Sequence, residues 1–291
     1  MLFRSDIKTL DWMGPATRAR ALDKIHNFTP KIGYPAKWRD YSALRVVRDD
    51  PVGNAQRAGV FEWNRDVARI NKSVDKSEWG MTPSTINAYY NPSFNEIVFP
   101  AAILQPPFFD PKADEAVNYG AIGSVIGHEI GHGFDDQGRH FDGDGKLRDW
   151  WTKADDTEFQ KRAKMLVAQF NVLEPLPGLK VKGELTLGEN IGDLGGLQIA
   201  FKAYKSSLGG KPAPVIDGFT GEQRFFIGSA QEWRDKYRDE FLRFIVTSNE
   251  HSPAMYRGSI PVRNTDAFYE AFSVKPGDKM FLKPEERVRI W

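Results

Sequence analysis

The stretch His128-Glu129-Ile130-Gly131-His132 decides how the rest of this chain is interpreted. Two histidines four residues apart lie on one face of an α-helix, where their imidazoles can bind the same metal ion. Glu129 projects beside them, within reach of a metal-bound water without being a ligand. The pentapeptide therefore predicts the core of a zinc hydrolase. Five residues can also match by chance, so the surrounding sequence must decide.

The composition indicates a globular protein with a substantial core. Its 291 residues, of which 41% are hydrophobic and 13% aromatic, are enough for one large domain or two closely packed subdomains. A net charge of +1 gives no reason to expect nucleic acid as a partner. The chain contains no cysteine, which leaves histidine, aspartate and glutamate as metal ligands.

Neither a membrane span nor an export signal is expected from this sequence. Apolar stretches such as Ile97 to Leu104 are far too short to cross a bilayer. The first residues, Met1 to Asp6, lack the apolar run of a signal peptide.

The segment before the motif predicts a helix and a β-hairpin. Pro15 suits a first helical turn, and residues 16–25 are rich in good helix formers. Between Asn87 and Phe99 the pattern alternates around turn-forming residues, which indicates a hairpin. A free hairpin edge near the metal could hold a peptide in strand form, or the hairpin could simply cover the core.

We expect one helix, about Lys112 to Gly133, to carry the metal motif. Four glycines form a stripe along it, which predicts close packing against another backbone: Gly120, Gly123, Gly127 and Gly131. Three isoleucines lie on a different face, suited to the core: Ile122, Ile126 and Ile130.

The second half of the chain predicts mainly helices. Apolar residues recur at helical spacing over 152–170, 188–208 and 221–246. The last stretch, 250–291, is richer in proline and glycine, and we expect it to wrap back across the body.

A tetrahedral zinc ion still lacks one protein ligand, and Glu189 is the best candidate. Glu189 and Asp193 lie four residues apart, so one carboxylate could bind the metal while the other accepts the outer N–H of a ligating histidine. Two alternatives remain open. Thr186 to Glu189 also fits a capping box, and Asp193 could be an ordinary solvated carboxylate. Asp135 could similarly act as an acceptor for His132.

Several ordered blocks around these residues resemble the neprilysin family of zinc endopeptidases, which includes endothelin-converting enzymes and bacterial oligopeptidase O proteins. The blocks occur in the family order and are more specific than the motif alone. They cover residues 87–90, 97–101, 103–109, 127–136 and 188–196, followed by His251-Ser252-Pro253 and Arg257.

The resemblance implies a thermolysin-like zincin fold of the α+β class, mainly α, with a small β-hairpin region beside the metal helix. It implies one zinc ion per chain, bound by His128, His132 and Glu189. It further implies that Glu129 is the catalytic base and that Asp193 orients a zinc-binding histidine, His128.

The same resemblance implies substrate-binding roles for peptide substrates. Asn87 and the Ala88 backbone would hold the peptide main chain, His251 would stabilise the oxyanion, and Arg257 would bind a substrate carbonyl. Four side chains would line the pocket for the residue after the scissile bond, although each also suits core packing: Ile103, Phe108, Val125 and Trp233.

The expected function is therefore zinc-dependent endopeptidase cleavage of short peptides on the amino side of bulky hydrophobic residues. The alternatives are a zinc aminopeptidase, or a non-catalytic fragment that binds zinc or peptides. The resemblance also implies an extracytoplasmic location.

We expect a single catalytic domain over residues 1–291. Residues 1–80 would form a first helix and loops, residues 81–150 the hairpin and metal helix, and residues 151–291 a helical subdomain with the third ligand and a substrate-binding tail. The resemblance covers only the family's carboxyl-terminal portion. The large helical domain that encloses the active site is expected to be absent here and to be this portion's partner.

Overall fold

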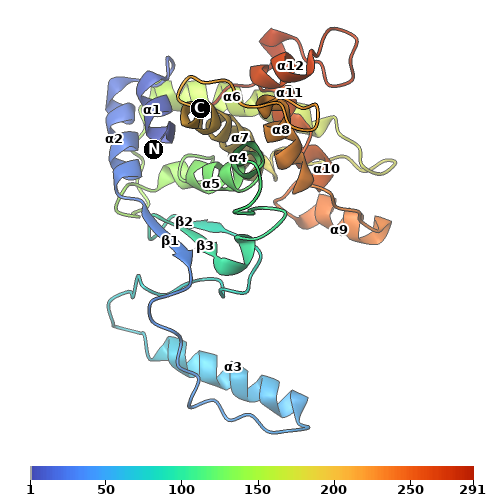
Figure 1. Ribbon diagram of the computed structural model, residues 1–291. Helices are drawn as coiled ribbons and strands as arrows, with labels where there is room; N and C mark the ends of the chain where they lie inside the picture. Colours follow the sequence, from blue (N-terminus) through green and yellow to red (C-terminus); the bar gives the residue numbers. More distant parts are fainter. Residues whose placement is uncertain (1) are drawn as a thin grey trace.

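The computed structural model describes residues 2–291, which form a mainly helical protein with one small three-stranded sheet. Helices α5 (Ile122–Gly131) and α7 (Leu187–Ser207) lie side by side at the centre, and the sheet lies below α5 (Figure 1). The other helices are α1 (Leu2–Thr9), α2 (Pro15–His26), α3 (Pro51–Val67), α4 (Glu115–Gly120), α6 (Lys153–Asn171), α8 (Gly221–Gln231), α9 (Asp239–Ser248), α10 (Ala254–Arg257), α11 (Ile260–Arg263) and α12 (Asp266–Phe272). Three short 3-10 helices span Ala101–Ile103, Gly138–His140 and Pro284–Glu286. The predicted α+β, mainly α class is confirmed.

The sheet confirms the predicted hairpin and adds a strand that the sequence did not reveal. Strands β2 (Tyr89–Asn91) and β3 (Glu96–Pro100) pair in antiparallel fashion. Strand β1 (Thr29–Gly33) pairs parallel to β3, in the order β1-β3-β2. Residues 29–33 are short and contain a proline, so only pairing with a distant strand makes them a strand. Residues 2–80, expected to form a first helix and loops, therefore contain three helices and this strand.

The prediction of one helix over Lys112 to Gly133 is wrong, because the chain breaks into α4 and α5. Ala121 has φ −88° and ψ −93°, outside the helical region. The backbone N–H of Ile122 donates to the carbonyl of Phe108 at 3.0 Å instead of to a helical partner. This tertiary hydrogen bond ends α4 and lets α5 start in a new direction.

A single helix over Gly221 to Val246 is also wrong. Helix α8 ends at Gln231 and α9 begins at Asp239. Between them, Trp233 packs against Gly258 and lies over the guanidinium of Arg257. The side-chain packing of Trp233 accounts for the interruption.

Glycines allow α5 and α7 to touch through their backbones, as the glycine stripe predicted. A Cβ on Gly127 would lie 2.7 Å from the Cα of Gly196, closer than packed carbon atoms approach. Of the three isoleucines, Ile122 and Ile130 are buried, but Ile126 is 40% exposed and lies outside the core. The prediction for Ile126 is therefore wrong.

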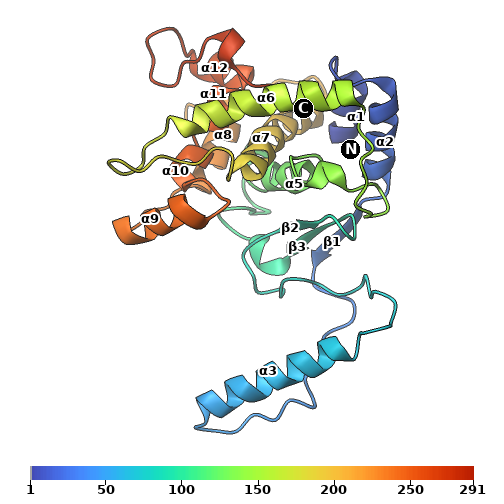
Figure 2. The same cartoon turned by 180° about the vertical axis from the view of Figure 1, so that it is seen from behind.

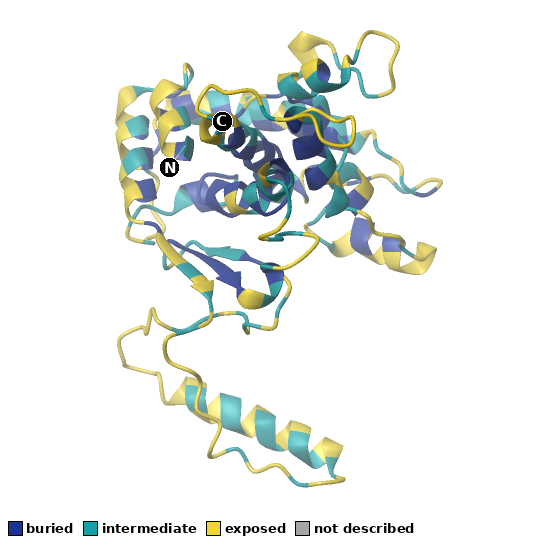
Figure 3. Ribbon diagram, in the orientation of Figure 1, coloured by how far each residue is buried: buried dark blue, intermediate teal, exposed yellow. Residues whose placement is uncertain are grey.

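Helix α3 stands apart from the body, below the sheet, in both views (Figures 1 and 2). None of its residues is buried, whereas α5 and α7 are mostly buried (Figure 3). Its start is stabilised locally, because the Asp50 side chain accepts the backbone N–H of Gly53 at 3.0 Å. Helix α3 therefore contributes little to the core around α5 and α7.

The carboxyl-terminal stretch wraps back across the body as predicted. The Trp291 ring lies 5.8 Å from Phe3, 5.9 Å from Phe134 and 6.2 Å from Phe159, measured between ring centroids. This aromatic cluster joins both ends of the chain to the segment that follows the metal motif.

Lys24 is a fully buried lysine that holds the loop after α5. Its Nζ donates to the carbonyls of Gly138 and Phe141, both at 2.7 Å. Burial lowers the pKa of Lys24 from 10.5 to about 7, and the negative charges of Asp135 and Asp142 offset this only in part.

We predict that Gly127→Ala destabilises the protein by roughly 1–3 kcal/mol, because the added methyl group meets backbone that cannot move aside. Gly123→Ala is the matched control, since a Cβ there would lie 3.5 Å from Ala200, an ordinary contact. It should leave stability unchanged or slightly raised. Chemical denaturation measures the free energy of unfolding of both variants and of the wild type. Equal stability of the two would show that the α5–α7 contact is not tight.

We also predict that Lys24 makes stability depend on pH. Between about pH 7 and 10.5 the unfolded chain holds a proton on Lys24 that the folded protein has lost. The unfolding free energy of the wild type should therefore rise with pH in this window, by on the order of a few kcal/mol relative to that of Lys24→Met. Below about pH 7 the difference in unfolding free energy between the two proteins should not change with pH. Chemical unfolding of both proteins across this range tests it. If the difference in unfolding free energy between wild type and Lys24→Met stayed constant from about pH 7 to 10.5, the lowered pKa of Lys24 would be contradicted.

Candidate metal centre

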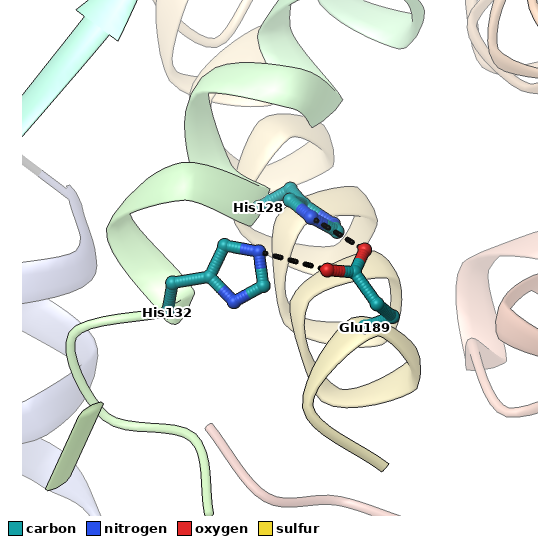
Figure 4. Close-up of side chains that lie close together, drawn as sticks. All are labelled: His128, His132 and Glu189. Carbon is teal, nitrogen blue, oxygen red and sulfur yellow. Dashed lines mark ion pairs between the residues drawn. The ribbon is translucent and has the colours of Figure 1, made fainter. Parts of the chain in front are cut away.

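Helices α5 and α7 bring the two predicted halves of the metal site together. His128 and His132 come from the end of α5, and Glu189 from the first turn of α7 (Figure 4). One ligand atom of each residue lies within 4.8 Å of the others. These three side chains could hold a metal ion.

Each histidine Nε2 lies near a different oxygen of Glu189, at a separation that lets the three side chains share one metal ion. His128 Nε2 lies 3.3 Å from Glu189 Oε2, and His132 Nε2 lies 3.5 Å from Glu189 Oε1. Two ligand atoms that are each about 2.0–2.2 Å from a tetrahedral zinc ion lie roughly 3.4 Å apart. The donor set of two imidazoles and one carboxylate is also typical of catalytic zinc.

Glu189 does not serve as a helix cap. Thr186, at the start of α7, makes no side-chain capping hydrogen bond, so the capping-box alternative is not observed. Burial raises the pKa of Glu189, but hydrogen bonds from His128 and His251 and the charge of His128 outweigh this and hold the pKa well below its usual range. Glu189 is therefore ionised, as a metal ligand must be.

The outer nitrogen of each histidine meets a buried carboxylate. His128 Nδ1 lies 2.9 Å from Asp193 Oδ1, and His132 Nδ1 lies 2.7 Å from Asp135 Oδ2. The other oxygen of Asp135 accepts the backbone N–H groups of Gln137 and Gly138, at 2.9 and 2.7 Å. Such contacts fix the tautomer and leave Nε2 of each histidine for a metal. Asp193 is buried, so it is not an ordinary solvated carboxylate.

Glu129 is buried next to the histidines but has an unpaired atom. Its Oε2 has no hydrogen-bond partner among residues 2–291. Burial raises the pKa of Glu129, whereas the positive charges of His128 and His132 lower it. A buried carboxylate oxygen without a partner fits a site built for a water molecule on a metal.

Arg257 neutralises the carboxylates of this centre. Its Nε and Nη2 each donate to Asp193 at 2.7 Å, and Nη2 also lies 3.1 Å from Glu189. Burial lowers the pKa of Arg257, but the charge of Asp193 and its hydrogen bonds outweigh burial and raise it. Nη1 has no hydrogen bond to the part of the chain that the structure describes. The sequence did not reveal this ion pair, because 64 residues separate its partners.

His251 approaches the centre from the segment between α9 and α10. Its Nε2 lies 3.1 Å from Glu189 Oε2, and its Nδ1 lies 2.9 Å from Asn249 Oδ1. Its side chain is 42% exposed. His251 can therefore contact both the centre and a molecule outside it.

A cavity of about 1020 Å³ opens over the centre. It is lined by every predicted substrate-binding residue: Asn87, Ala88, Ile103, Phe108, Val125, Trp233, His251 and Arg257. Ala88 and Ile103 are almost fully buried, so they also belong to the core, as the alternative for Ile103 stated. Glu232 lines the same cavity, and no sequence pattern had singled it out.

A second group of potential ligands shares Glu189. Ligand atoms of Glu189, Glu250 and His251 also lie within 4.8 Å of one another. Glu250 is exposed, and exposed carboxylates often gather without an ion. The first group, which is largely buried and supported by Asp193 and Asp135, is the stronger candidate.

Comparisons with known proteins agree with this geometry. A family model described as peptidase family M13 matches residues 87–288, and a second model of that family, for its amino-terminal part, matches residues 2–35. Neprilysin-1 of Caenorhabditis elegans is 38% identical over 305 residues, covering 99% of this chain and 40% of that protein. Endothelin-converting enzyme 1 of Homo sapiens is 37% identical over 299 residues, covering 99% and 38%.

Solved structures show the same relationship. The crystal structure of Mycobacterium tuberculosis zinc metalloprotease ZMP1 in complex with inhibitor is 58% identical, with a TM-score of 0.97, covering 100% of this chain and 45% of that chain. PEPO from Lactobacillus rhamnosis is 35% identical, with a TM-score of 0.87, covering 100% and 45%. This chain thus spans less than half the length of these relatives. It belongs to peptidase family M13, together with neprilysins and endothelin-converting enzymes.

Proposed function

We propose that this protein is the zinc-binding catalytic part of an endopeptidase that hydrolyses short peptides. One observation supports the proposal: α5 and α7 bring together three potential metal ligands and an unpaired Glu129, all of which line a cavity of about 1020 Å³. When bound by His128, His132 and Glu189, zinc would lower the pKa of its water toward about 7 and polarise the substrate carbonyl.

The residues around the metal would do the remaining chemistry. Glu129 takes the proton of the attacking water and then passes it to the leaving amine. His251 donates a hydrogen bond to the carbonyl oxygen as negative charge develops there. Asp193 and Asp135 hold the two histidines in the orientation that binds the metal.

The peptide would lie along the free edge of the sheet. Strand β2 is an outer strand, and the preceding residues Asn87 and Ala88 line the cavity. Their polar groups would bind the peptide main chain as an added strand does. Nη1 of Arg257 is left to bind a substrate carbonyl beyond the cleaved bond.

The residue after the cleaved bond would enter the cavity against Ile103, Phe108, Val125 and Trp233, which all line it. These walls favour a bulky apolar side chain at that position.

No helix among residues 2–291 is both long and apolar enough to cross a membrane. By similarity to its family, we propose an extracytoplasmic location. The same similarity suggests that the family's amino-terminal helical domain is the partner of this portion.

We predict that Glu129→Gln lowers turnover by at least about 100-fold, because the amide cannot accept the proton. The variant should still bind about one zinc ion per chain, since Glu129 is not a ligand. Incubation of both proteins with a diverse peptide mixture, followed by mass spectrometry of the products, measures the effect and reveals the residue after each cut. Equal cleavage by both proteins would refute Glu129 as the base. Zinc binding without any cleavage would favour a non-catalytic peptide-binding protein.

We further predict that Asp135→Asn weakens zinc binding by about 10- to 100-fold, because the amide presents its NH₂ group to His132 and no longer stabilises the required tautomer. Asp136→Asn is the matched control, since the neighbouring Asp136 hydrogen-bonds Gln137 and no histidine. Competition with a chromogenic chelator measures both affinities. Equal weakening by both substitutions would mean that charge alone, and not the contact with His132, supports the metal.

A further inference from the structure

Glu232 is a carboxylic acid in the cavity that the proposed mechanism does not use. It directly follows α8 and lines the cavity beside Trp233. Its Oε2 is completely buried and has no hydrogen-bond partner among residues 2–291. A buried oxygen of this kind is costly, so an unpaired one at a cavity wall indicates a position where a ligand supplies the partner.

Glu232 forms no ion pair within residues 2–291, although the charge of Arg257 is near enough to act on it. Burial raises the pKa of Glu232 well above its usual range, and the negative charge of Asp193 raises it further. The positive charge of Arg257 offsets only part of this rise in the pKa of Glu232. The Nε and Nη2 of Arg257 already donate hydrogen bonds to Asp193 and Glu189. A cation placed against Glu232 would offset the cost of its burial and stabilise its ionised form.

The cavity that Glu232 lines is suited to a long side chain with a polar end. Trp233 precedes the loop to α9, and Phe108 and Val125 line the same cavity. Lysine and arginine bury their methylene groups along such apolar surfaces while the charged end reaches a polar group. Among the other acids of the site, Glu189 and Asp193 are already engaged with histidines and Arg257. Like Asp136, which also lines the cavity, Glu232 has a buried oxygen without a partner among residues 2–291, and Glu232 directly precedes the pocket residue Trp233.

We propose that Glu232 is a specificity-determining residue that accepts a hydrogen bond from a basic side chain, lysine or arginine, on the substrate residue after the cleaved bond. This inference rests on the proposed peptidase function. It extends the substrate class from bulky apolar residues to residues that have an apolar stem and a nitrogen donor at the end.

Two peptides that differ only after the cleaved bond, with lysine or norleucine there, test the inference. The Glu232→Leu variant keeps the approximate size of the side chain and removes the acceptor. The ratio of kcat/KM for the lysine peptide to that for the norleucine peptide should fall by about 10-fold or more relative to wild type. Glu232→Gln, which keeps an acceptor without the charge, should give a smaller fall and serves as the test if the leucine variant does not fold.

Glu250→Gln is the matched control, because Glu250 is an exposed acid on the rim of the same cavity. If the preference for lysine came from the general negative charge of the cavity, this control would lower the ratio as much as Glu232→Leu. Equal falls would therefore overturn the specific role of Glu232, as would an unchanged ratio in Glu232→Leu and Glu232→Gln.

Binding measurements separate this inference from the proposed function. If wild type cleaves both peptides and the ratio does not depend on Glu232, the inference fails and the peptidase function stands. If wild type cleaves neither, calorimetric titration with the same peptides decides. Tighter binding of the lysine peptide that is lost in Glu232→Leu would support the inference although the peptidase function fails. Equal binding of the two peptides would overturn it.

Discussion

The metal centre depends on the direct contact between the backbones of α5 and α7. A Cβ on Gly127 would meet Gly196, and a Cβ on Gly192 would lie 2.7 Å from the ring of His128. Only glycine permits this approach, and without it the carboxylate of Glu189 could not reach both histidines. The helix-destabilising tendency of these glycines is offset by the burial of the two helices against each other.

The same contact concentrates charged groups that must balance one another. Glu189 and Asp193 lie one helical turn apart, and Arg257 donates to both from the carboxyl-terminal part of the chain. A buried ion network is tolerated only when its members are hydrogen-bonded, and these are. Around this network, three acids that line the cavity each have a buried oxygen without a partner among residues 2–291: Glu129, Asp136 and Glu232. We assign two of these oxygens to reactants, that of Glu129 to the water and that of Glu232 to a substrate side chain.

Much of the site could be predicted before the structure, but for different reasons. His128 and His132 follow from helical spacing alone, because four residues are about one turn. Glu189 could not be identified as a ligand from spacing alone, since Thr186 to Glu189 also fits a helix capping box. Only the resemblance to a family favoured Glu189 as a ligand. The Arg257–Asp193 pair and Glu232 escaped prediction, because a partner distant in sequence leaves no local pattern. The break at Ala121 escaped it too, because a hydrogen bond to the distant carbonyl of Phe108 causes it.

The sequence by itself determined the local chemistry: which residues can bind a metal, where the hairpin turns, and that the helices around the motif pack closely through glycine. These properties depend on neighbours within one turn or one strand, so the order of residues is enough. Only the tertiary structure decided that Thr29–Gly33 is a strand, that Ile126 is exposed, that Arg257 pairs with Asp193 and Glu189, and that Glu232 lines the cavity over them. Those outcomes depend on which distant segments come together, and burial and charge then act between them.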